Sequence, residues 1–252
     1  MKRLDQRLVD EGLAPTRSKA QQLIEEGEGE VQAGSEWQVA TRPAQKTSAL
    51  VRLKSEAQTL KYVSRGGLKL EAALRHLQLS VEGWRCLDAG QSTGGFTDAL
   101  LQAGARKVIG FDVGHDQLAL KLRNDPRVRF FEGIHIRDLS SHHELASLIA
   151  EGIELCVADL SFISFTHALA PLQNVLTEGC RLLALIKPQF EAGPQALNSR
   201  GVLADPTLLD ESTKPVLQAL PKYGFSVIDH FPSAVKGQDG NQEFFVYAHR
   251  CI

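Results

Sequence analysis

The residues with the clearest chemical signature form a turn at 86–97, which reads Cys-Leu-Asp-Ala-Gly-Gln-Ser-Thr-Gly-Gly-Phe-Thr. Asp88 ends a short apolar run, the glycines allow the backbone to approach a ligand, and residues 97–104 have apolar positions at helical spacing. Asp112 ends a second apolar run, 24 residues after Asp88. A carboxylate there can accept hydrogen bonds from both hydroxyls of a ribose. The pairing of the two acids predicts a site for an adenosine-containing cofactor.

The spacing within this turn distinguishes between cofactors. It lacks the Gly-x-Gly-x-x-Gly spacing of a dinucleotide site, and the chain has no Gly-Lys-Ser/Thr of a P-loop. Asp88 would repel a pyrophosphate and attract an amino or sulfonium group. We therefore expect S-adenosylmethionine. The residues expected to hold it are Asp88, Gly90, Ser92, Thr93, Gly94, Gly95, Phe96 and Asp112.

From residue 62 onward, apolar runs alternate with segments of helical periodicity. The expected strands are 85–89, 108–113, 128–133, 155–160 and 182–187. This alternation predicts an α/β fold with a parallel sheet covered on both faces. Two final strands, at 225–231 and 243–249, are joined by a Gly/Ser/Asp-rich stretch and can run antiparallel at one edge. The plan is typical of a class I, Rossmann-like methyltransferase with a mostly parallel seven-stranded sheet. Ligands then bind at the carboxyl ends of the strands, at Asp88, Asp112, Asp159 and Lys187.

The first sixty residues form a separate pattern, with two short helices before residue 27 and short strands at 28–40. We expect one domain over 1–60 and a second over 61–252. Thr-Arg-Ser-Lys-Ala at 16–20 and Leu-Ile-Glu-Glu-Gly at 23–27 resemble the small α+β RNA-binding domain shared by ribosomal protein S4, pseudouridine synthases and tyrosyl-tRNA synthetases. The resemblance implies that Arg17 and Lys19 face RNA. A helical hairpin used for protein contacts is the alternative.

The net charge of −2 hides a basic stretch between residues 42 and 75, which holds eight basic and two acidic residues. Such a stretch favours phosphate backbones, although a solvated linker would have the same composition. The basic residues expected at an RNA interface are Arg52, Lys54, Lys61 and Arg65.

No apolar run is long enough to span a bilayer, and the first residues lack an apolar signal core, so we expect a cytoplasmic protein without a membrane partner. The four cysteines have no Cys-x-x-Cys spacing, and the eight histidines add no ligand pattern. We therefore expect buried, reduced thiols and no metal.

Five segments together resemble the TlyA family of ribosomal RNA 2′-O-methyltransferases, whose members are sometimes labelled hemolysins. These segments are 62–70, 88–97, 157–164, 185–191 and 240–245. The resemblance runs the whole length of the chain and implies an FtsJ-like methyltransferase domain after an S4-type domain. It also implies transfer of a methyl group from S-adenosylmethionine to a cytidine ribose of 16S or 23S ribosomal RNA. Gln91 and Gln242 depart from the family pattern, and the segment 133–137, around His135, lacks the Asn that is expected near the adenine.

The family carries a tetrad of two lysines and two acids, and its positions fall on Lys69, Asp159, Lys187 and Glu243. A ribose hydroxyl is a weak acid and must be activated in line with the methyl group. Lys187 would act on that hydroxyl as a neutral base or as a cation stabilising the alkoxide. The resemblance implies that Asp159 orients Lys187 near the methyl donor and the cofactor, and that Lys69 and Glu243 position the ribose.

The residues after Asp159 read Leu-Ser-Phe, unlike the Asn/Asp-Pro-Pro-Tyr/Phe of enzymes that methylate base amines. Phe162 or Phe190 could stack on a flipped nucleotide, but we expect the core for both. Two other function classes stay open. One is a catalytically silent RNA-binding or ribosome-assembly factor, and the other is a membrane-active hemolysin. The sequence does not indicate an oligomeric state.

Overall fold

The computed structural model describes residues 1–14, 16–25, 27–53, 61–198, 201–203, 205, 207–237 and 240–251. The chain divides into two compact units, Met1–Tyr62 and Val63–Ile252. Lys54, one of the expected RNA contacts, lies outside the described residues.

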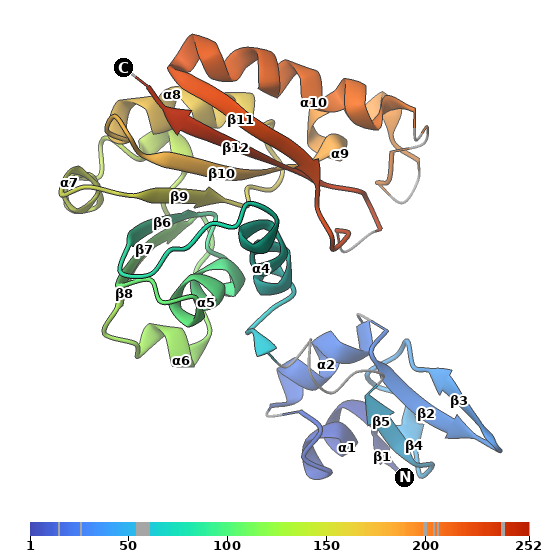
Figure 1. The fold of residues 1–252 in the computed structure, drawn as a ribbon. Helices are drawn as coiled ribbons and strands as arrows, with labels where there is room; N and C mark the ends of the chain where they lie inside the picture. Colours follow the sequence, from blue (N-terminus) through green and yellow to red (C-terminus); the bar gives the residue numbers. More distant parts are fainter. Residues whose placement is uncertain are drawn as a thin grey trace. The chain divides into compact units, whose positions relative to one another are not determined.

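The first unit is a small α+β structure (Figure 1). Its helices are α1 (Leu4–Asp10) and α2 (Arg17–Glu25), and its strands are β1 (Lys2–Arg3), β2 (Gly29–Ala33), β3 (Glu36–Val39), β4 (Lys46–Thr47) and β5 (Val51–Leu53). Strand β2 pairs antiparallel with β3 and β5, and β1 pairs with β4. The apolar faces of both helices pack with β5 into one core. The expected helices and the hairpin are therefore present.

The second unit is built on a seven-stranded sheet of order β11-β12-β10-β9-β6-β7-β8 (Figure 1). The strands are β6 (Arg85–Ala89), β7 (Lys107–Asp112), β8 (Val128–Glu132), β9 (Leu155–Ala158), β10 (Arg181–Ile186), β11 (Phe225–Pro232) and β12 (Phe244–Arg250). Strand β12 pairs antiparallel with β10 and β11, and the other pairs in this sheet are parallel. The predicted fold class is confirmed.

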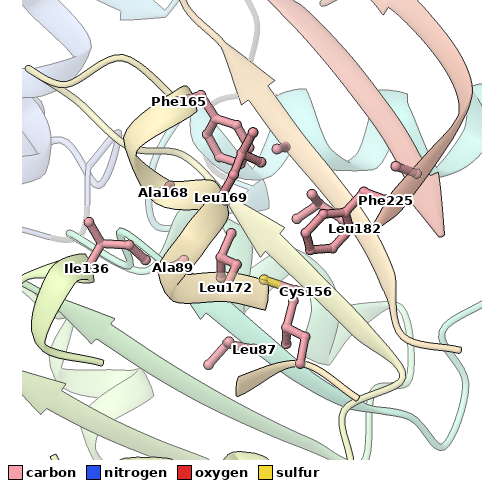
Figure 2. Close-up of a cluster of buried hydrophobic side chains, with 14 of the residues drawn as sticks. Leu87, Ala89, Ile136, Cys156, Phe165, Ala168, Leu169, Leu172, Leu182 and Phe225 are labelled. Carbon is pink, nitrogen blue, oxygen red and sulfur yellow. The ribbon is translucent and has the colours of Figure 1, made fainter. Parts of the chain in front are cut away.

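Helices pack on the sheet, so a buried strand side chain meets the helices on the face to which it points. They are α4 (Gly66–His76), α5 (Gly95–Gln102), α6 (Leu120–Arg123), α7 (His143–Ala150), α8 (Thr166–Val175), α9 (Pro188–Glu191) and α10 (Leu208–Ala219), with 3₁₀ turns η1 (Ile136–Asp138), η2 (Pro194–Ala196) and η3 (Leu220–Tyr223). Figure 2 shows Leu169 and Leu172 of α8 in one buried cluster with Leu87 and Ala89 of β6. Because strand side chains alternate, Asp88 points to the opposite face, toward α5.

Two sequence-based expectations need correction. Strand β9 ends at Ala158, so Asp159 and Leu160 belong to the following loop. Cys86, Cys156 and Cys180 are buried as expected, but Cys251 is exposed because it follows the last strand, beyond its packed residues. Within the described part of the chain, no helix is both long and apolar enough to cross a membrane.

Candidate active site

The carboxyl ends of β6, β7 and β9 surround a cavity of about 510 Å³. This volume is in the range of small-molecule sites. Four of the residues expected to bind the cofactor line it, namely Gly90, Ser92, Asp112 and Asp159. The lining also includes His135, which belongs to the segment 133–137 that lacks the Asn of the family pattern. The Nδ1 atom of His135 accepts a hydrogen bond from the backbone N–H of Arg137 at 3.1 Å.

Gly90 lets two strand ends approach closely at this cavity. Its φ is +83°, and a Cβ atom there would lie 2.6 Å from the carbonyl oxygen of Asp159. A side chain at this position would therefore be strained and would also collide with backbone. Glycine is required here to keep the floor of the cavity open.

Asp112 is the last residue of β7, and the surrounding backbone holds its carboxylate in place. One oxygen accepts a hydrogen bond from the N–H of Ser92 at 2.9 Å, and the other accepts one from the N–H of Gly114 at 2.7 Å. Each carboxylate oxygen can accept a further hydrogen bond. The arrangement suits a carboxylate that binds the two hydroxyls of a ribose.

Asp88 is fully buried, and its two carboxylate oxygens differ in their hydrogen bonding. Thr97 donates to its Oδ2 at 2.6 Å, and Gln91 Nε2 donates in turn to Thr97 Oγ1 at 2.7 Å. Oδ1 has no hydrogen-bond partner among the described residues. Burial raises the pKa of Asp88 to about 7. A buried oxygen without a partner fits a cofactor that brings a positively charged group or a donor.

Gln91 departs from the family pattern, and the structure shows what accommodates it. A Cβ atom at Gly110 would lie 2.2 Å from the Gln91 side chain. The glycine in β7 thus leaves the space that the longer side chain fills. Gln91 then serves as the outer member of the Asp88–Thr97 hydrogen-bond chain.

The remaining residues expected at the cofactor shape the turn, and neither they nor Asp88 are among the described residues that line the cavity. Gly94 has a φ of +92° and is the N-cap residue that precedes α5. A Cβ atom at Gly95 would lie 3.0 Å from the backbone nitrogen of Gly67, so α4 and α5 cross closely there. Phe96 is buried and stacks on Phe245. The carbonyl of Thr93 accepts a hydrogen bond from the N–H of Ala119.

Lys187 and Asp159 form the first ion pair of the tetrad. They follow β10 and β9, which are parallel neighbours, and the Lys187 Nζ atom lies 2.6 Å from Asp159 Oδ1. The same Nζ donates a hydrogen bond to Ser161 Oγ at 2.7 Å. Asp159 also lines the cavity, so this ion pair connects the cavity to Lys187.

Lys69 and Glu243 form the second ion pair, with 2.6 Å between Nζ and Oε2 and both side chains buried. Lys69 comes from α4, and Glu243 immediately precedes β12. Ile186 pairs with Phe244 in the β10–β12 ladder, so Lys187 and Glu243 face each other where that ladder ends. Two lysines and two carboxylates thus gather at one end of the sheet. Their charges balance, as buried charges require.

Comparison with known proteins identifies the family of the chain. The model of the FtsJ-like methyltransferase family matches residues 62–250. The chain belongs to this family. The model of the S4 domain matches residues 2–28. As an FtsJ-like methyltransferase, the protein uses S-adenosylmethionine, the cofactor expected from the Asp88 turn.

Relatives extend the similarity over nearly the whole chain of this FtsJ-like methyltransferase. The 16S/23S rRNA (cytidine-2′-O)-methyltransferase TlyA of Mycobacterium tuberculosis is 38% identical over 97% of this chain and 88% of the relative. Hemolysin A of Brachyspira hyodysenteriae is 36% identical, over 97% and 98% of the two chains. A solved structure from Streptococcus thermophilus that carries a hemolysin designation has a TM-score of 0.73 at 36% identity, covering 99% of this chain and 88% of its own.

Phe162 is 92% exposed, so the expectation that it belongs to the core is wrong. It lies in the loop after β9, lines the cavity and has a φ of +65°. Its ring centroid lies 5.5 Å from that of Phe190, which is itself partly buried. Strand β9 ends four residues before Phe162, so the ring lies beyond the sheet and does not pack in the core.

Several basic side chains of the FtsJ-like enzyme expected at RNA have partners within the protein. Arg17 shares the buried carboxylate of Asp5 with Arg3, at 3.0 and 2.9 Å. Arg52 pairs with Glu30 at 2.7 Å and lies 4.1 Å from the centre of the Trp37 ring. The other described candidates are Lys61, which lies over the Tyr62 ring, Arg65, which precedes α4, and Lys19, whose N–H bonds Thr16.

Sequence reasoning missed three residues that hold the site together. Thr97 bonds Asp88, Ser161 bonds Lys187, and Glu191 binds the loop that carries Phe162. Ser161 and Glu191 both fall inside segments that resemble the family. Their nearness to Asp159 and Lys187 in the sequence was the available signal.

Proposed function

We propose that this enzyme methylates the 2′-hydroxyl of a cytidine in ribosomal RNA. The observation that carries the proposal is the contact of Lys187 with Asp159, since Asp159 belongs to the cofactor cavity and Lys187 to the charged tetrad. The Mycobacterium tuberculosis relative is a 16S/23S rRNA (cytidine-2′-O)-methyltransferase, which supports cytidine as the target. Ribosomal subunits are then the partners, and the cytoplasm is the place of action.

The arrangement around Lys187 suits activation of a weakly acidic hydroxyl. An ammonium group has three donors, and Asp159 and Ser161 engage two directions of the Nζ atom. The third direction can face the substrate oxygen. As a cation, Lys187 would stabilise the developing alkoxide, and as a neutral amine it would accept the hydroxyl proton. S-adenosylmethionine supplies the electrophilic methyl group when it is bound.

Glu243 and Lys69 would hold the ribose from the neighbouring strand end, as the family tetrad implies. Their ion pair is buried, and Gly237 lies close enough that a Cβ atom there would approach Glu243 Oε1 to 2.8 Å. This close packing limits the motion of the carboxylate. A fixed carboxylate can orient a hydroxyl with little loss of entropy in the reaction.

The RNA itself would be bound by the S4-type domain proposed for residues 1–60 and by basic residues near the methyltransferase domain proposed for 61–252. The candidates are Arg17, Lys19, Arg52, Lys54, Lys61 and Arg65. Phe162, exposed beside the cavity, would stack on the base of the target nucleotide.

The test is transfer of a labelled methyl group from S-adenosylmethionine to purified ribosomal subunits that lack the modification. Small and large subunits are assayed separately, and the product is mapped for 2′-O-methylation. We expect a ribose-methylated cytidine in one or both. Cofactor binding without transfer to either subunit would favour an RNA-binding or assembly factor, and leakage of liposomes caused by the pure protein would favour a hemolysin.

The variant Lys187→Ala should abolish methyl transfer and leave binding of RNA largely intact, because it removes one reactive amine from a preformed site. Lys222→Ala, at an exposed lysine in η3, is the matched control and should retain wild-type activity. Unchanged transfer in Lys187→Ala would contradict the role given to this lysine.

A further inference from the structure

We propose that Glu191 is a positioning residue that holds the loop carrying Phe162 against the loop carrying Lys187. The two segments are the β9 loop, residues 159–165, and the segment after β10, residues 187–191, which consists of Lys187 and helix α9. The inference rests on the proposed function, because it assigns the exposed Phe162 ring to the RNA substrate.

Glu191 joins the two loops through both of its carboxylate oxygens. Ser164 Oγ lies 2.6 Å from Oε2 and donates to it, and the N–H of Phe165 donates to Oε1 at 2.8 Å. The hydroxyl of Thr166 lies 2.7 Å from Ser164 Oγ and extends the network into the first turn of α8. A carboxylate at the start of a helix is also favoured by the helix dipole.

Lys187 and Phe190 also connect the same two segments. Lys187 binds Asp159 and Ser161 at the start of both segments. The rings of Phe190 and Phe162 contact each other, and along the two segments they come between the contacts of Lys187 and those of Glu191. The connection made by Glu191 involves no residue of the tetrad. Its role is therefore separable from catalysis.

Phe162 needs such support because its own packing provides little. The ring is 92% exposed, and its backbone has a φ of +65°, which is unfavourable for a bulky side chain. A strained conformation persists only where the surrounding structure holds it. Ser164 and Phe165, which Glu191 binds, follow Phe162 directly after Ile163. They restrain the loop on the side away from Asp159.

The environment of Glu191 also indicates a held carboxylate. Burial raises its pKa, and the hydrogen bonds from Ser164 and Phe165 act in the opposite direction. A polar group is buried at a cost unless it has partners, and here both partners come from the β9 loop. An aromatic ring that is already positioned loses less conformational entropy when a nucleotide stacks on it.

The experiment compares Glu191→Ala with Glu191→Gln in the full chain, with ribosomal subunits as substrate. Glutamine can keep both contacts, because its carbonyl accepts from Phe165 N–H and its amide donates to Ser164 Oγ, whose own hydrogen can turn to Thr166. We expect Glu191→Ala to raise the KM for subunits about tenfold, with unchanged S-adenosylmethionine affinity, and Glu191→Gln to stay near wild type. Glu178→Ala, at an exposed glutamate, is the control.

A second readout follows the ring itself. With 4-fluorophenylalanine at position 162, the ¹⁹F resonance of Glu191→Ala should narrow relative to that of the parent protein, since the ring gains freedom. If neither the width of the ¹⁹F resonance nor the KM for subunits changes in Glu191→Ala, the inference is overturned. It is also overturned if Glu191→Ala and Glu191→Gln raise the KM equally, or if Glu191→Ala weakens the binding of S-adenosylmethionine. If the parent protein methylates no subunit and the line still narrows in Glu191→Ala, the proposed function fails and the positioning role stands.

Discussion

Asp88 has a more demanding environment than its place at the end of a strand suggested. The carboxyl group is fully buried, receives a hydrogen bond from Thr97 and is near two other acids, Asp159 and Asp112. Burial is the largest cause of its raised pKa, and the neighbouring acids add to it. The residue is thus costly to ionise until a positive ligand group arrives.

Because of this cost, the unfolding free energy should depend on pH in a defined direction. The pKa of Asp88 is about 7 in the folded state against 3.8 as the ordinary value, so between these values the folded state binds more protons. Stability is therefore lost as the pH rises through this window. Relative to Asp88→Asn, the wild-type unfolding free energy should fall by on the order of 4 kcal/mol from about pH 4 to about pH 7 and then level off. Urea unfolding of both proteins across this range measures it, and parallel curves would contradict a raised pKa.

At the scale of residues, the sequence predicts the acids and lysines better than their partners. Asp88, Asp112 and Lys187 stand at the ends of apolar runs, where a polar side chain is conspicuous. Ser161 lies in the loop after β9, and Glu191 ends the four-residue helix α9, so both segments are too short to show a periodic pattern. Their contacts depend on the path of the backbone after β9 and β10, which local sequence does not determine.

The turn between β6 and α5 depends on glycine at Gly90 for two separate reasons, a positive φ and a close backbone neighbour. Gly179 has a similar φ, +81°, but a Cβ atom there would have no described neighbour within 4 Å, so this glycine isolates the first reason. A comparison of substitutions at Gly90 and Gly179 thus separates the effect of backbone strain from that of steric collision.

We expect Gly179→Ala to lower the unfolding free energy by about 1 kcal/mol, the usual cost of a left-handed conformation for a residue with a Cβ atom. Gly90→Ala should cost about 3 kcal/mol or more, because the Asp159 carbonyl must also move. It should weaken S-adenosylmethionine binding too. Denaturant unfolding and calorimetric titration provide the measurements, and equal losses in the two variants would show that the Asp159 contact is unimportant.

At the scale of elements, periodicity located every strand of the large sheet within about two residues, but it did not fix strand pairing. The tetrad depends on that pairing. Lys187 and Glu243 are far apart in the sequence and meet only because β12 inserts antiparallel between β10 and β11. The short helices α6 and α9 were also missed, since four residues carry too little periodic signal.

At the scale of the whole molecule, the basic stretch predicts how RNA binding should depend on salt. Each phosphate contact that is lost should lower the slope of log K against log salt concentration by about 1. We expect this from charge reversal at Lys61 and at Arg65, with Lys222→Glu as a control on an exposed lysine outside the stretch. Filter binding of ribosomal RNA over a salt series measures the slope. A residue whose reversal leaves it unchanged does not contact phosphate.

The division of the chain was visible from composition and periodicity, which change near residue 60, whereas the compact units divide after Tyr62. The charge of single residues was a weaker guide. Arg17 and Arg52 were expected to face phosphate, yet each also has an acidic partner in its own unit, Asp5 and Glu30. Sequence shows how many charges a segment has, but the fold decides how many remain to attract a ligand.

The burial of three cysteines has a practical consequence for studying the enzyme. Burial raises the pKa values of Cys86, Cys156 and Cys180, the last to about 12, so their reactive thiolate forms are scarce and shielded. Cys251 alone among the four is exposed. A maleimide dye added to the native wild-type chain should therefore attach at one position, beyond β12 and at the opposite end of that strand from Glu243. The protein can thus be labelled with one dye at one position, without any substitution, and used to measure binding to ribosomal subunits.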